Sequence, residues 1–299
     1  MPELPEVEAL RLGLVDRIIN SKIISVEILK PKIISGNGTK RTPSKTKTQN
    51  FIEKVSGRKI KEIRRIAKNL IIEFENKSVL VTHLKMTGQL VFVNNKKEKT
   101  LGGHPITSSY TEDLPNKHTC IIFNLNNGSL FYNDVRMFGY VLFYNNLLEA
   151  REKGHFKNIG LEPFNKEFTL AYFKKELKKK NKNIKAVLLE QSIVNGCGNI
   201  YADEVCFASK VLPMRMCKSL DEKEISALYK NIKNILSLAI KHGGSSVSDY
   251  LLADGSRGNY TRLHKVYKRS GEKCKTCGNV LEKDTVAGRT TVFCRICQK

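Results

Sequence analysis

The chain changes its hydrophobic pattern near residue 150, and this change restricts the possible folds more than any other feature. Short apolar runs of strand length alternate with turn residues before that point, as at Asn127-Gly128. Beyond it, apolar residues recur three and four positions apart, which is the spacing of amphipathic helices. The 299 residues suffice for two domains with their own cores and a small additional module. We therefore expect an α+β multidomain protein, β-rich first and helical second.

The β-rich half opens with a helix. Apolar residues recur at helical spacing from Pro5 to Ile19, and proline is tolerated in a first helical turn. The runs that follow favour an antiparallel β-sandwich or barrel, with the leading helix holding the amino terminus against a core. Residues 95–117 are polar and contain glycine, which predicts an exposed loop. The predicted strands are 22–30, 70–75, 79–84, 89–93, 120–125, 129–132 and 139–144.

The second half carries several helical patterns. Asp221 with Glu224 is a capping-box pair, which predicts the start of a long helix that runs to Gly243-Gly244. Residues 244–262 are rich in glycine and serine and predict a mobile loop. The other helices are indicated by Leu170, Phe173 and Leu177, by Ile184, Val187 and Leu188, and by the run from Asn199 to Ser209.

The eight cysteines include two CxxC pairs, which 16 residues separate. Two such pairs can give four thiolates to one tetrahedral zinc ion, and a closed four-cysteine site is structural because it leaves no open position. A redox-active pair is the alternative, which the doubled spacing disfavours. We expect one structural zinc per chain, bound by Cys274, Cys277, Cys294 and Cys297.

The zinc module contains a second feature between its cysteine pairs. Residues 287–293 predict a hairpin turn with Arg289 at its tip, although a solvated surface arginine would look the same. Farther back in the chain, a glycine-bearing turn at 196–198 precedes a helix that begins near Asn199. Helix amino termini present free N–H groups, which suit a phosphate. The alternative is that Asn199 is a simple N-cap.

The charge of the chain points to its partner. A net charge of +23 and a pI of about 9.7 favour a polyanion, which is DNA, RNA or an anionic membrane surface. No run approaches the roughly 20 apolar residues of a membrane span. The amino terminus lacks a secretion signal, so we expect reduced cysteines and a cytoplasmic protein. Nucleic acid is the leading partner.

The first residues carry a possible nucleophile. An initiator methionine before proline is normally removed, which would leave Pro2 as a secondary amine beside the carboxylate of Glu3. An α-amino group has an ordinary pKa of about 7.7–8.0, so part of it is neutral near pH 7. Such an amine can form a Schiff base while the carboxylic acid transfers the proton. The alternative is a plain extension ahead of the helix.

Motifs along the whole chain occur in the order found in one family. The chain resembles the bacterial formamidopyrimidine-DNA glycosylases over essentially its full length. The motifs that carry this resemblance are PELPEVE at 2–8, Arg65–Lys68, His83–Gly88, Asp134–Gly139, Gly198–Glu204 and the terminal cysteine module.

The resemblance implies an activity and an architecture. It implies a bifunctional DNA glycosylase and AP lyase of base excision repair, which excises 8-oxoguanine and formamidopyrimidines and ends with β,δ-elimination. The partner would be double-stranded DNA with oxidised bases or abasic sites, bound by a monomer in the bacterial cytoplasm, at the nucleoid. The implied domains are a catalytic β-sandwich at 1–148, a linker at 149–164, a helix-two-turn-helix domain at 165–268 and a zinc finger at 269–299.

The resemblance also implies roles for residues at the sugar and the phosphates. Pro2 matches the family's nucleophile, which attacks C1′ and expels the damaged base. Glu3 matches the carboxyl group that protonates the opening sugar. Lys68, Asn199 and Arg289 match residues that grip phosphates around the lesion, with Lys68 and Arg289 counted in the catalytic set.

A further group matches residues at the DNA backbone and at the base stack. His83 matches a histidine at the DNA backbone, although a histidine with satisfied hydrogen bonds inside a strand is the alternative. Met86, Arg136 and Phe138 match the side chains that fill the gap left by an everted nucleotide. A base must leave the stack before its sugar is attacked, and an apolar wedge keeps the stack from reclosing. Without the resemblance, Phe138 would be read as a core residue.

Three features depart from the family pattern. Met137 stands where the family often has a second basic residue, so one charged contact has no counterpart here. Residues 95–117 form a longer segment than usual, to which we assign no role. Residues 244–262 correspond to the loop that covers the everted base, but their sequence identifies no specificity residues.

Three other functions stay open at this point. The endonuclease VIII type of the same superfamily removes oxidised pyrimidines and usually begins PEGPE. Leu4 in this chain therefore favours the formamidopyrimidine-DNA glycosylase type. A non-catalytic zinc-containing DNA-binding protein would have no need of Pro2-Glu3 together with Lys68. An RNA-binding zinc ribbon would prefer RNA and would not depend on a lesion.

Overall fold

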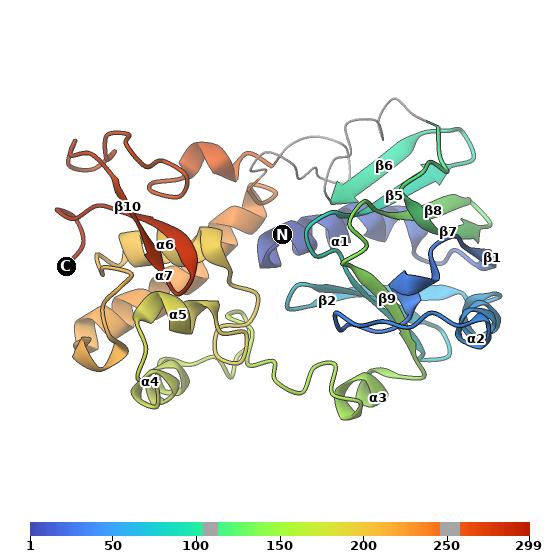
Figure 1. The fold of residues 1–299 in the computed structure, drawn as a ribbon, viewed down its shortest axis with the longest axis horizontal. Helices are drawn as coiled ribbons and strands as arrows, with labels where there is room; N and C mark the ends of the chain where they lie inside the picture. Colours follow the sequence, from blue (N-terminus) through green and yellow to red (C-terminus); the bar gives the residue numbers. More distant parts are fainter. Residues whose placement is uncertain (104–112, 246–257) are drawn as a thin grey trace. The chain divides into compact units, whose positions relative to one another are not determined.

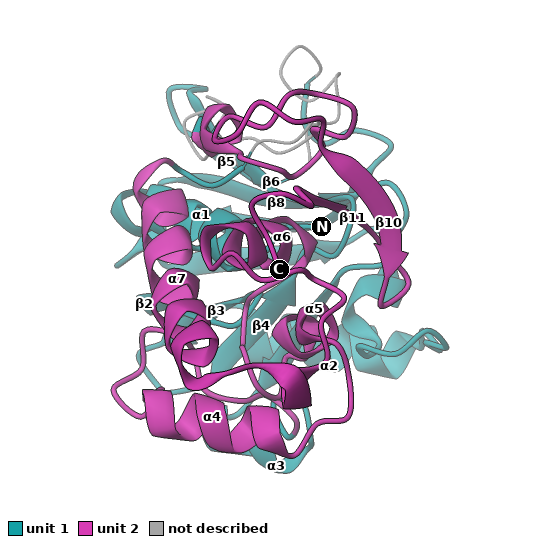
Figure 2. Cartoon of the chain, turned by 90° about the vertical axis from the view of Figure 1, so that its left-hand side faces the viewer, with its two compact units in different colours: residues 1–157, 243–259 teal, residues 158–242, 260–299 magenta. Residues whose placement is uncertain are grey.

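The computed structural model describes residues 1–103, 113–245 and 258–299. The chain divides into two compact units (Figures 1 and 2). Unit 1 contains Met1–Lys157 and Gly243–Asn259, and unit 2 contains Asn158–His242 and Tyr260–Lys299. The described strands of unit 1 and helices of unit 2 confirm the change of pattern near residue 150. The finer boundaries at 148, 164 and 268 stay a prediction.

Unit 1 is built on two antiparallel sheets. Its strands are β1 (Ile23–Ile28), β2 (Ile60–Ile66), β3 (Asn69–Phe74), β4 (Val79–His83), β5 (Gly88–Asn94), β6 (Lys99–Gly103), β7 (Thr119–Leu125), β8 (Gly128–Asp134) and β9 (Tyr140–Tyr144). The order is β1-β7-β8-β5-β6 in one sheet and β2-β3-β4-β9 in the other. The seven predicted strands are all present, and alternate apolar residues of both sheets supply one core.

The leading helix, α1 (Leu4–Ile18), is central to that core. Leu10, Leu14 and Ile18 are completely buried, and α1 packs on β2, β3 and β6. Burial of each such side chain contributes roughly 1.5–3 kcal/mol. The helix starts firmly because the Glu3 N–H donates to Glu6 Oε2 at 2.8 Å. The residues just ahead of α1 are therefore fixed.

The loop expected over 95–117 is partly wrong. Lys99–Gly103 form β6, which pairs with β5 at the edge of the larger sheet. Gly102 faces α1, where any side chain would collide with Leu10 Cδ1. Glycine is rare in strands, so Gly102, which permits this close packing, and Gly103 beside it concealed the strand. Residues 104–112 lie outside the described ranges.

Other elements of unit 1 gave too weak a signal to be predicted. They include a short 3-10 helix, η1 (Pro31–Ile34), then α2 (Lys45–Val55), strand β2, and α3 (Leu147–Glu152). Helix α2 buries only Phe51 and Val55, so its amphipathic pattern is thin. Its start is marked by Ser44, whose side chain accepts a hydrogen bond from the Lys47 N–H at 3.1 Å. The segment between η1 and α2 contains Arg41.

Unit 2 contains the predicted helices and the zinc-module hairpin. The capping box of the long helix is confirmed, since the Glu224 N–H donates to Asp221 Oδ1 at 2.8 Å and the Asp221 N–H donates to Glu224 Oε2 at 2.9 Å. None of the helices in the described ranges is long and apolar enough to cross a membrane. The elements are α4 (Leu170–Lys178), α5 (Ile184–Leu189), α6 (Asn199–Ala208), α7 (Glu222–Lys241), β10 (Glu282–Val286) and β11 (Arg289–Phe293), with short 3-10 helices at Cys217–Ser219 and Tyr260–Leu263.

The loop predicted over 244–262 falls mostly outside the described residues. At its start, the Ser245 N–H donates to Glu6 Oε1 at 2.7 Å within unit 1. At its end, residues 260–262 belong to the 3-10 helix Tyr260–Leu263.

Candidate functional site

The predicted nucleophile and its carboxylate lie at the buried start of α1. Pro2 is buried and Glu3 is 5% exposed, whereas Met1 ahead of them is 57% exposed. With Met1 in place, the Pro2 nitrogen is part of an amide. Because Met1 contributes so little to the core, its removal would release a Pro2 amine that α1 already holds in position.

Two of the sequence motifs meet beside α1. Arg65 Nε donates to Glu8 Oε2 at 2.9 Å, and Arg65 Nη1 donates to the Ala67 carbonyl at 3.1 Å. Ala67 has a φ of 57°, which makes the tight turn between β2 and β3. This turn sets the backbone of Lys68, which is 7% exposed. Arg65 thus links the PELPEVE motif to the predicted phosphate-binding lysine.

Positive charge gathers around Lys68. Burial, followed by the nearby charges of Lys68 and Arg41, lowers the pKa of Lys85. The ammonium group of Lys85 also lies over the Tyr140 ring, 5.8 Å from its centroid. Like charges this close repel one another, and a bound anion would relieve that repulsion. The cluster therefore suits a phosphate group.

His83 ends β4 inside the same region of unit 1. Burial, then Lys85, Lys68, His155 and the amino terminus, hold the pKa of His83 well below 6.5, so the ring is neutral at pH 7. Its Nδ1 accepts a hydrogen bond from the Lys85 N–H at 3.0 Å, which makes Nε2 the donor. Its ring packs against Tyr140, with 5.5 Å between centroids. The contacts suit a strand histidine, and its role at the DNA backbone stays a prediction.

Met86, Arg136 and Phe138 form one exposed cluster. The Arg136 guanidinium lies 4.4 Å from the centroid of the Phe138 ring, and its Nη1 lies 3.4 Å from Met86 Sδ. Met86 is 48% exposed and Phe138 is 44% exposed, so the reading of Phe138 as a core residue is wrong. An apolar pair next to a guanidinium is suited to entering a base stack and hydrogen-bonding an unpaired base.

Asp134 organises the loop that carries this cluster. Its Oδ1 accepts from Thr87 Oγ1 at 2.5 Å, and its Oδ2 accepts from the Gly139 N–H at 2.8 Å. The Arg136 N–H donates to Thr87 Oγ1 at 3.1 Å. Asp134 and Thr87 lie inside motifs noted in the sequence, but no pattern there predicts that they hold this loop.

Asn199 and the zinc-module hairpin meet in unit 2. Gly198 is the N-cap of α6 and Asn199 is the first helical residue, so the N-cap reading of Asn199 is wrong. Asn199 Nδ2 instead donates to the Thr290 carbonyl at 3.1 Å. Thr290 follows the exposed Arg289, which stands directly after the Ala287-Gly288 turn. The two predicted phosphate contacts therefore lie on adjoining segments.

A buried ion pair, which the sequence analysis missed, supports the same hairpin. Lys185 Nζ lies 2.6 Å from Asp203 Oδ1, and both side chains are fully buried. Lys185 Nζ also donates to Thr291 Oγ1 at 2.6 Å, and the Val292 N–H donates to Asp203 Oδ2 at 3.2 Å. Burial raises the pKa of Asp203 to about 6, against the lowering effect of Lys185. The sequence offered one indication of this pair: Lys185 stands between apolar residues of the short helix α5, where a buried cation needs an acidic partner.

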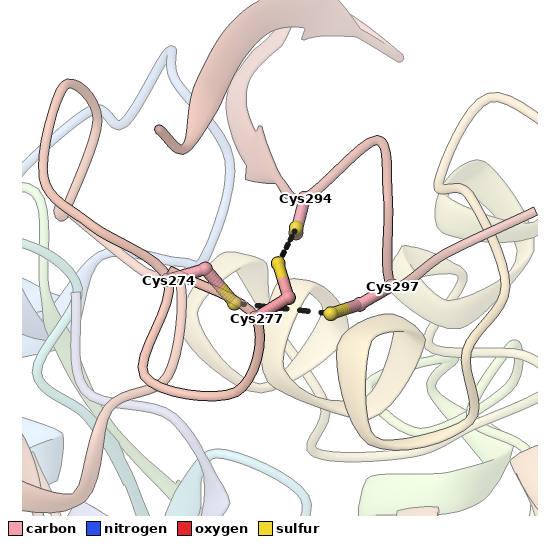
Figure 3. A group of neighbouring side chains, drawn as sticks. All are labelled: Cys274, Cys277, Cys294 and Cys297. Atoms are coloured by element: carbon pink, nitrogen blue, oxygen red, sulfur yellow. Dashed lines mark hydrogen bonds between the residues drawn. The ribbon is translucent and has the colours of Figure 1, made fainter. Parts of the chain in front are cut away.

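The four cysteine sulfurs of the zinc module converge (Figure 3). Their Sγ atoms all lie within 4.8 Å of one another, with 3.4 Å between Cys277 and Cys294 and 3.9 Å between Cys274 and Cys297. A tetrahedral zinc ion with Zn–S bonds of about 2.3 Å needs sulfurs about 3.8 Å apart. The cluster fits one such ion, as its spacing in the sequence predicted.

Family models match three parts of the chain. Residues 1–141 match the formamidopyrimidine-DNA glycosylase N-terminal domain, and residues 159–250 match the formamidopyrimidine-DNA glycosylase H2TH domain. Residues 271–299 match the zinc finger found in FPG and IleRS. These matches confirm the predicted fold class, including the helix-two-turn-helix domain and the zinc finger.

Full-length relatives and solved structures agree with these models. The formamidopyrimidine-DNA glycosylases of Carboxydothermus hydrogenoformans and Listeria innocua are 38% and 37% identical to this chain, and each alignment covers 100% of both proteins. Lactococcus lactis Fpg (MutM) in complex with an N7-benzyl-Fapy-dG containing DNA has a TM-score of 0.83 and 35% identity, covering 100% of both chains. Its complex with an abasic site containing DNA has a TM-score of 0.83 and 35% identity, covering 99% of both chains.

Proposed function

The chain belongs to the formamidopyrimidine-DNA glycosylase family, and on that premise we propose that it is a DNA glycosylase and AP lyase of base excision repair. Its substrates are 8-oxoguanine and formamidopyrimidines in double-stranded DNA. One observation carries the proposal: Pro2 and Glu3 are buried at the start of α1, and Arg65 joins that helix to the turn that carries Lys68. Removal of Met1 would therefore produce an amine nucleophile on a helix that is held to a phosphate-binding lysine.

Pro2 attacks the sugar once Met1 is gone. The neutral secondary amine bonds to C1′ of the damaged nucleotide, and the C1′–N bond to the base breaks with its electron pair leaving on the base. The proton that the amine loses balances the one that the departing base takes up. Glu3 then protonates O4′ as the C1′–O4′ bond breaks, and the Pro2 nitrogen lone pair completes the C1′=N iminium.

The iminium makes strand cleavage possible. It acidifies C2′, and loss of a C2′ proton expels the 3′ phosphate with the C3′–O bonding electrons. In a second elimination, loss of the C4′ proton expels the 5′ phosphate with the C5′–O bonding electrons. Water then hydrolyses the iminium and frees Pro2, which leaves a gap flanked by phosphates.

The exposed cluster of Met86, Arg136 and Phe138 holds the lesion outside the stack. Unpairing and unstacking a base costs about a few kcal/mol, which is least for an abasic site. Met86 and Phe138 occupy the vacated space, and Arg136 hydrogen-bonds the widowed base. His83 donates from Nε2 to the DNA backbone.

The phosphate contacts come from both units. Lys68 in unit 1 and Asn199 and Arg289 in unit 2 neutralise or hydrogen-bond phosphates around the lesion. Cys274, Cys277, Cys294 and Cys297 would hold one zinc ion, which when bound cross-links the hairpin that carries Arg289. The protein works as a monomer, at the nucleoid of a bacterial cytoplasm.

A panel of end-labelled duplexes tests the proposal. Purified protein is incubated with DNA that contains 8-oxoguanine, a formamidopyrimidine, thymine glycol or an abasic site, with undamaged DNA and RNA as controls. We expect excision of the two purine lesions and incision of the abasic duplex. Preference for thymine glycol would favour an endonuclease VIII type activity. Binding without any cleavage, or preference for RNA, would contradict the proposal.

A further inference from the structure

The wedge loop, residues 135–139 between β8 and β9, is held on one side by Asp134 and Thr87. These two side chains fix N–H groups of the loop, at Gly139 and Arg136. Asp134 and Thr87 do not bind the backbone carbonyl groups of Met137 and Gly139 in this loop, so another group must hold them. A loop that inserts side chains into a base stack benefits when both its N–H and its carbonyl groups are fixed. Any backbone freedom in the loop would have to be lost on insertion, at a cost in free energy.

Arg41 holds the carbonyl side. Its Nη1 donates to the Gly139 carbonyl at 2.6 Å and its Nη2 donates to the Met137 carbonyl at 2.5 Å. These acceptors are 98 and 96 residues away in the sequence, so the contact joins two distant segments of unit 1. A planar guanidinium can make two parallel bonds of this kind, whereas a lysine ammonium cannot reproduce the fork.

The loop has a conformation that needs such support. Met137 has a φ of 51°, in the left-handed region that residues other than glycine rarely adopt. At Gly139 any side chain would collide with the Tyr132 hydroxyl and with the His83 carbonyl. Met137 packs partly against the core, so the chain turns inward between the outward-facing Arg136 and Phe138. The two carbonyls that Arg41 holds are those of Met137 and Gly139, on either side of Phe138.

We propose that Arg41 is a positioning residue for the wedge: its guanidinium fork fixes the carbonyls of Met137 and Gly139 and so sets Phe138 and Arg136 for insertion into the base stack. The inference rests on the proposed function, since it assumes that these side chains fill the space of an everted nucleotide. The fork is already engaged by two carbonyls, which distinguishes Arg41 from a phosphate-binding arginine.

The test compares Arg41→Lys and Arg41→Ala with Arg58→Ala in the full-length protein. Arg58 is a matched control, because it is a half-buried arginine of unit 1 that donates to a backbone carbonyl, that of Lys54, at 3.0 Å. Three quantities are measured: excision from a paired 8-oxoguanine, incision at a preformed abasic site, and the fluorescence rise of 2-aminopurine beside the lesion when its stack opens. The salt dependence of binding gives the number of phosphate contacts.

We expect both Arg41 variants to slow excision and stack opening by about tenfold or more, with abasic incision much less affected. Arg41→Lys keeps the charge, so its binding should keep the wild-type salt dependence, and Arg58→Ala should resemble the wild type throughout. Wild-type excision by Arg41→Lys would overturn the inference, because charge alone would then suffice. Equal loss of excision and abasic incision would also overturn it.

Failure of the proposed function would look different. If the wild type neither excised 8-oxoguanine nor opened the stack, or if Phe138→Ala lost both reactions equally, the wedge itself would be refuted. If Phe138→Ala slowed excision but spared abasic incision, while Arg41→Lys did not, only the proposed role of Arg41 would be refuted.

Discussion

Units 1 and 2 hold their candidate functional residues by different physical means. In unit 1, side chains fix the backbone around the site, as Glu6 does for the Glu3 N–H and Asp134 does for the wedge loop. In unit 2, the β10–β11 hairpin that carries Arg289 is held by the fully buried Lys185–Asp203 pair and by four cysteines that fit one metal ion. Both units thus use hydrogen bonds between side chains and backbone, and unit 2 adds a buried ion pair and a four-cysteine cluster.

This difference corresponds to the chemistry proposed for each unit. A nucleophile and a wedge must stand within a fraction of an ångström of their targets, which requires many local contacts. A phosphate contact tolerates more variation, because charge acts at a distance and the DNA backbone is flexible. Damage to the nucleophile or to the wedge in unit 1 should therefore change reaction steps, and damage to the phosphate contacts of unit 2 should change binding.

Removal of zinc should show the largest effect on unit 2. Zinc contributes about 10–16 kcal/mol of apparent binding free energy in zinc-finger peptides, so its loss should unfold the hairpin that carries Arg289. We expect Cys294→Ser, or chelation of the metal, to abolish tight DNA binding while hydrogen exchange of α1 and the unit 1 sheets stays unchanged. Metal analysis should find about one zinc per chain. A metal-free protein that binds and cleaves normally would remove zinc from the account.

The buried ion pair should come next. Lys185→Met leaves Asp203 without its cation, and breaking a fully buried pair costs about 3–5 kcal/mol. Hydrogen exchange should rise in α5, α6 and β11 but not in unit 1. Replacing both partners with apolar residues, as in Lys185→Met with Asp203→Leu, should recover much of the stability. If Lys185→Met had no effect on exchange in β11, the pair would not support the hairpin.

Phe138 and Lys68 offer a contrast inside unit 1. Phe138→Ala should slow excision from a base pair by about 30- to 100-fold, a loss of about 2–3 kcal/mol, and should spare incision at an abasic site. Lys68→Ala should weaken binding to all duplexes. It should also reduce the slope of log K against log salt concentration by about 1, because one phosphate contact is lost. Identical profiles for the two variants would mean that insertion and phosphate contact are not separate functions.

Acid should destabilise both units through buried histidines, which are His83 and His155 in unit 1 and His264 in unit 2. Burial lowers the pKa of His155 in unit 1 and of His264 in unit 2 to about 4, below the ordinary 6.5. Both are neutral when folded, so the stability they contribute is present above pH 6.5 and is lost as the pH falls toward 4. Because His264 is only 3% exposed, it should lower the free energy of unfolding of unit 2 by about 1–2 kcal/mol between pH 7 and pH 5.

Urea unfolding at the two pH values checks this prediction. His264→Gln should flatten the pH dependence of unit 2 alone. His155→Gln should reduce that of unit 1 alone without removing it, because His83 still contributes. Each unit is followed by hydrogen exchange. A wild-type protein whose stability did not change between pH 7 and pH 5 would show that these rings titrate normally.

The sequence predicted what short stretches determine. Helix α1, the capping box at Asp221 and the four-cysteine cluster are each encoded within a few dozen residues, and each is confirmed. The side chains of the wedge were found only through the resemblance to a family. Their clustering could not come from spacing, because Met86 and Arg136 are 50 residues apart.

What the sequence did not predict depends on contacts between distant segments. Arg41 lies in a polar, lysine-rich stretch where nothing marks one cation above the others. Strand β6 is concealed by two glycines, of which Gly102 is needed because it packs against Leu10 and Gly103 because it packs against the backbone of β5. The Lys185–Asp203 pair joins two helices, and its burial cannot be read from either one. Each of these features acquires its meaning only after the chain has folded.

Borohydride trapping of the covalent intermediate tests the central claim most directly. Protein freed of Met1 is mixed with abasic-site DNA and borohydride, which reduces an iminium to a stable amine, and the adduct is mapped by peptide analysis. We predict that the adduct lies on Pro2, that a permanent amino-terminal tag abolishes it while DNA binding persists, and that Glu3→Gln binds lesions but loses most excision. An adduct on Lys68 or another lysine, or normal trapping by a protein with a blocked amino terminus, would contradict the account.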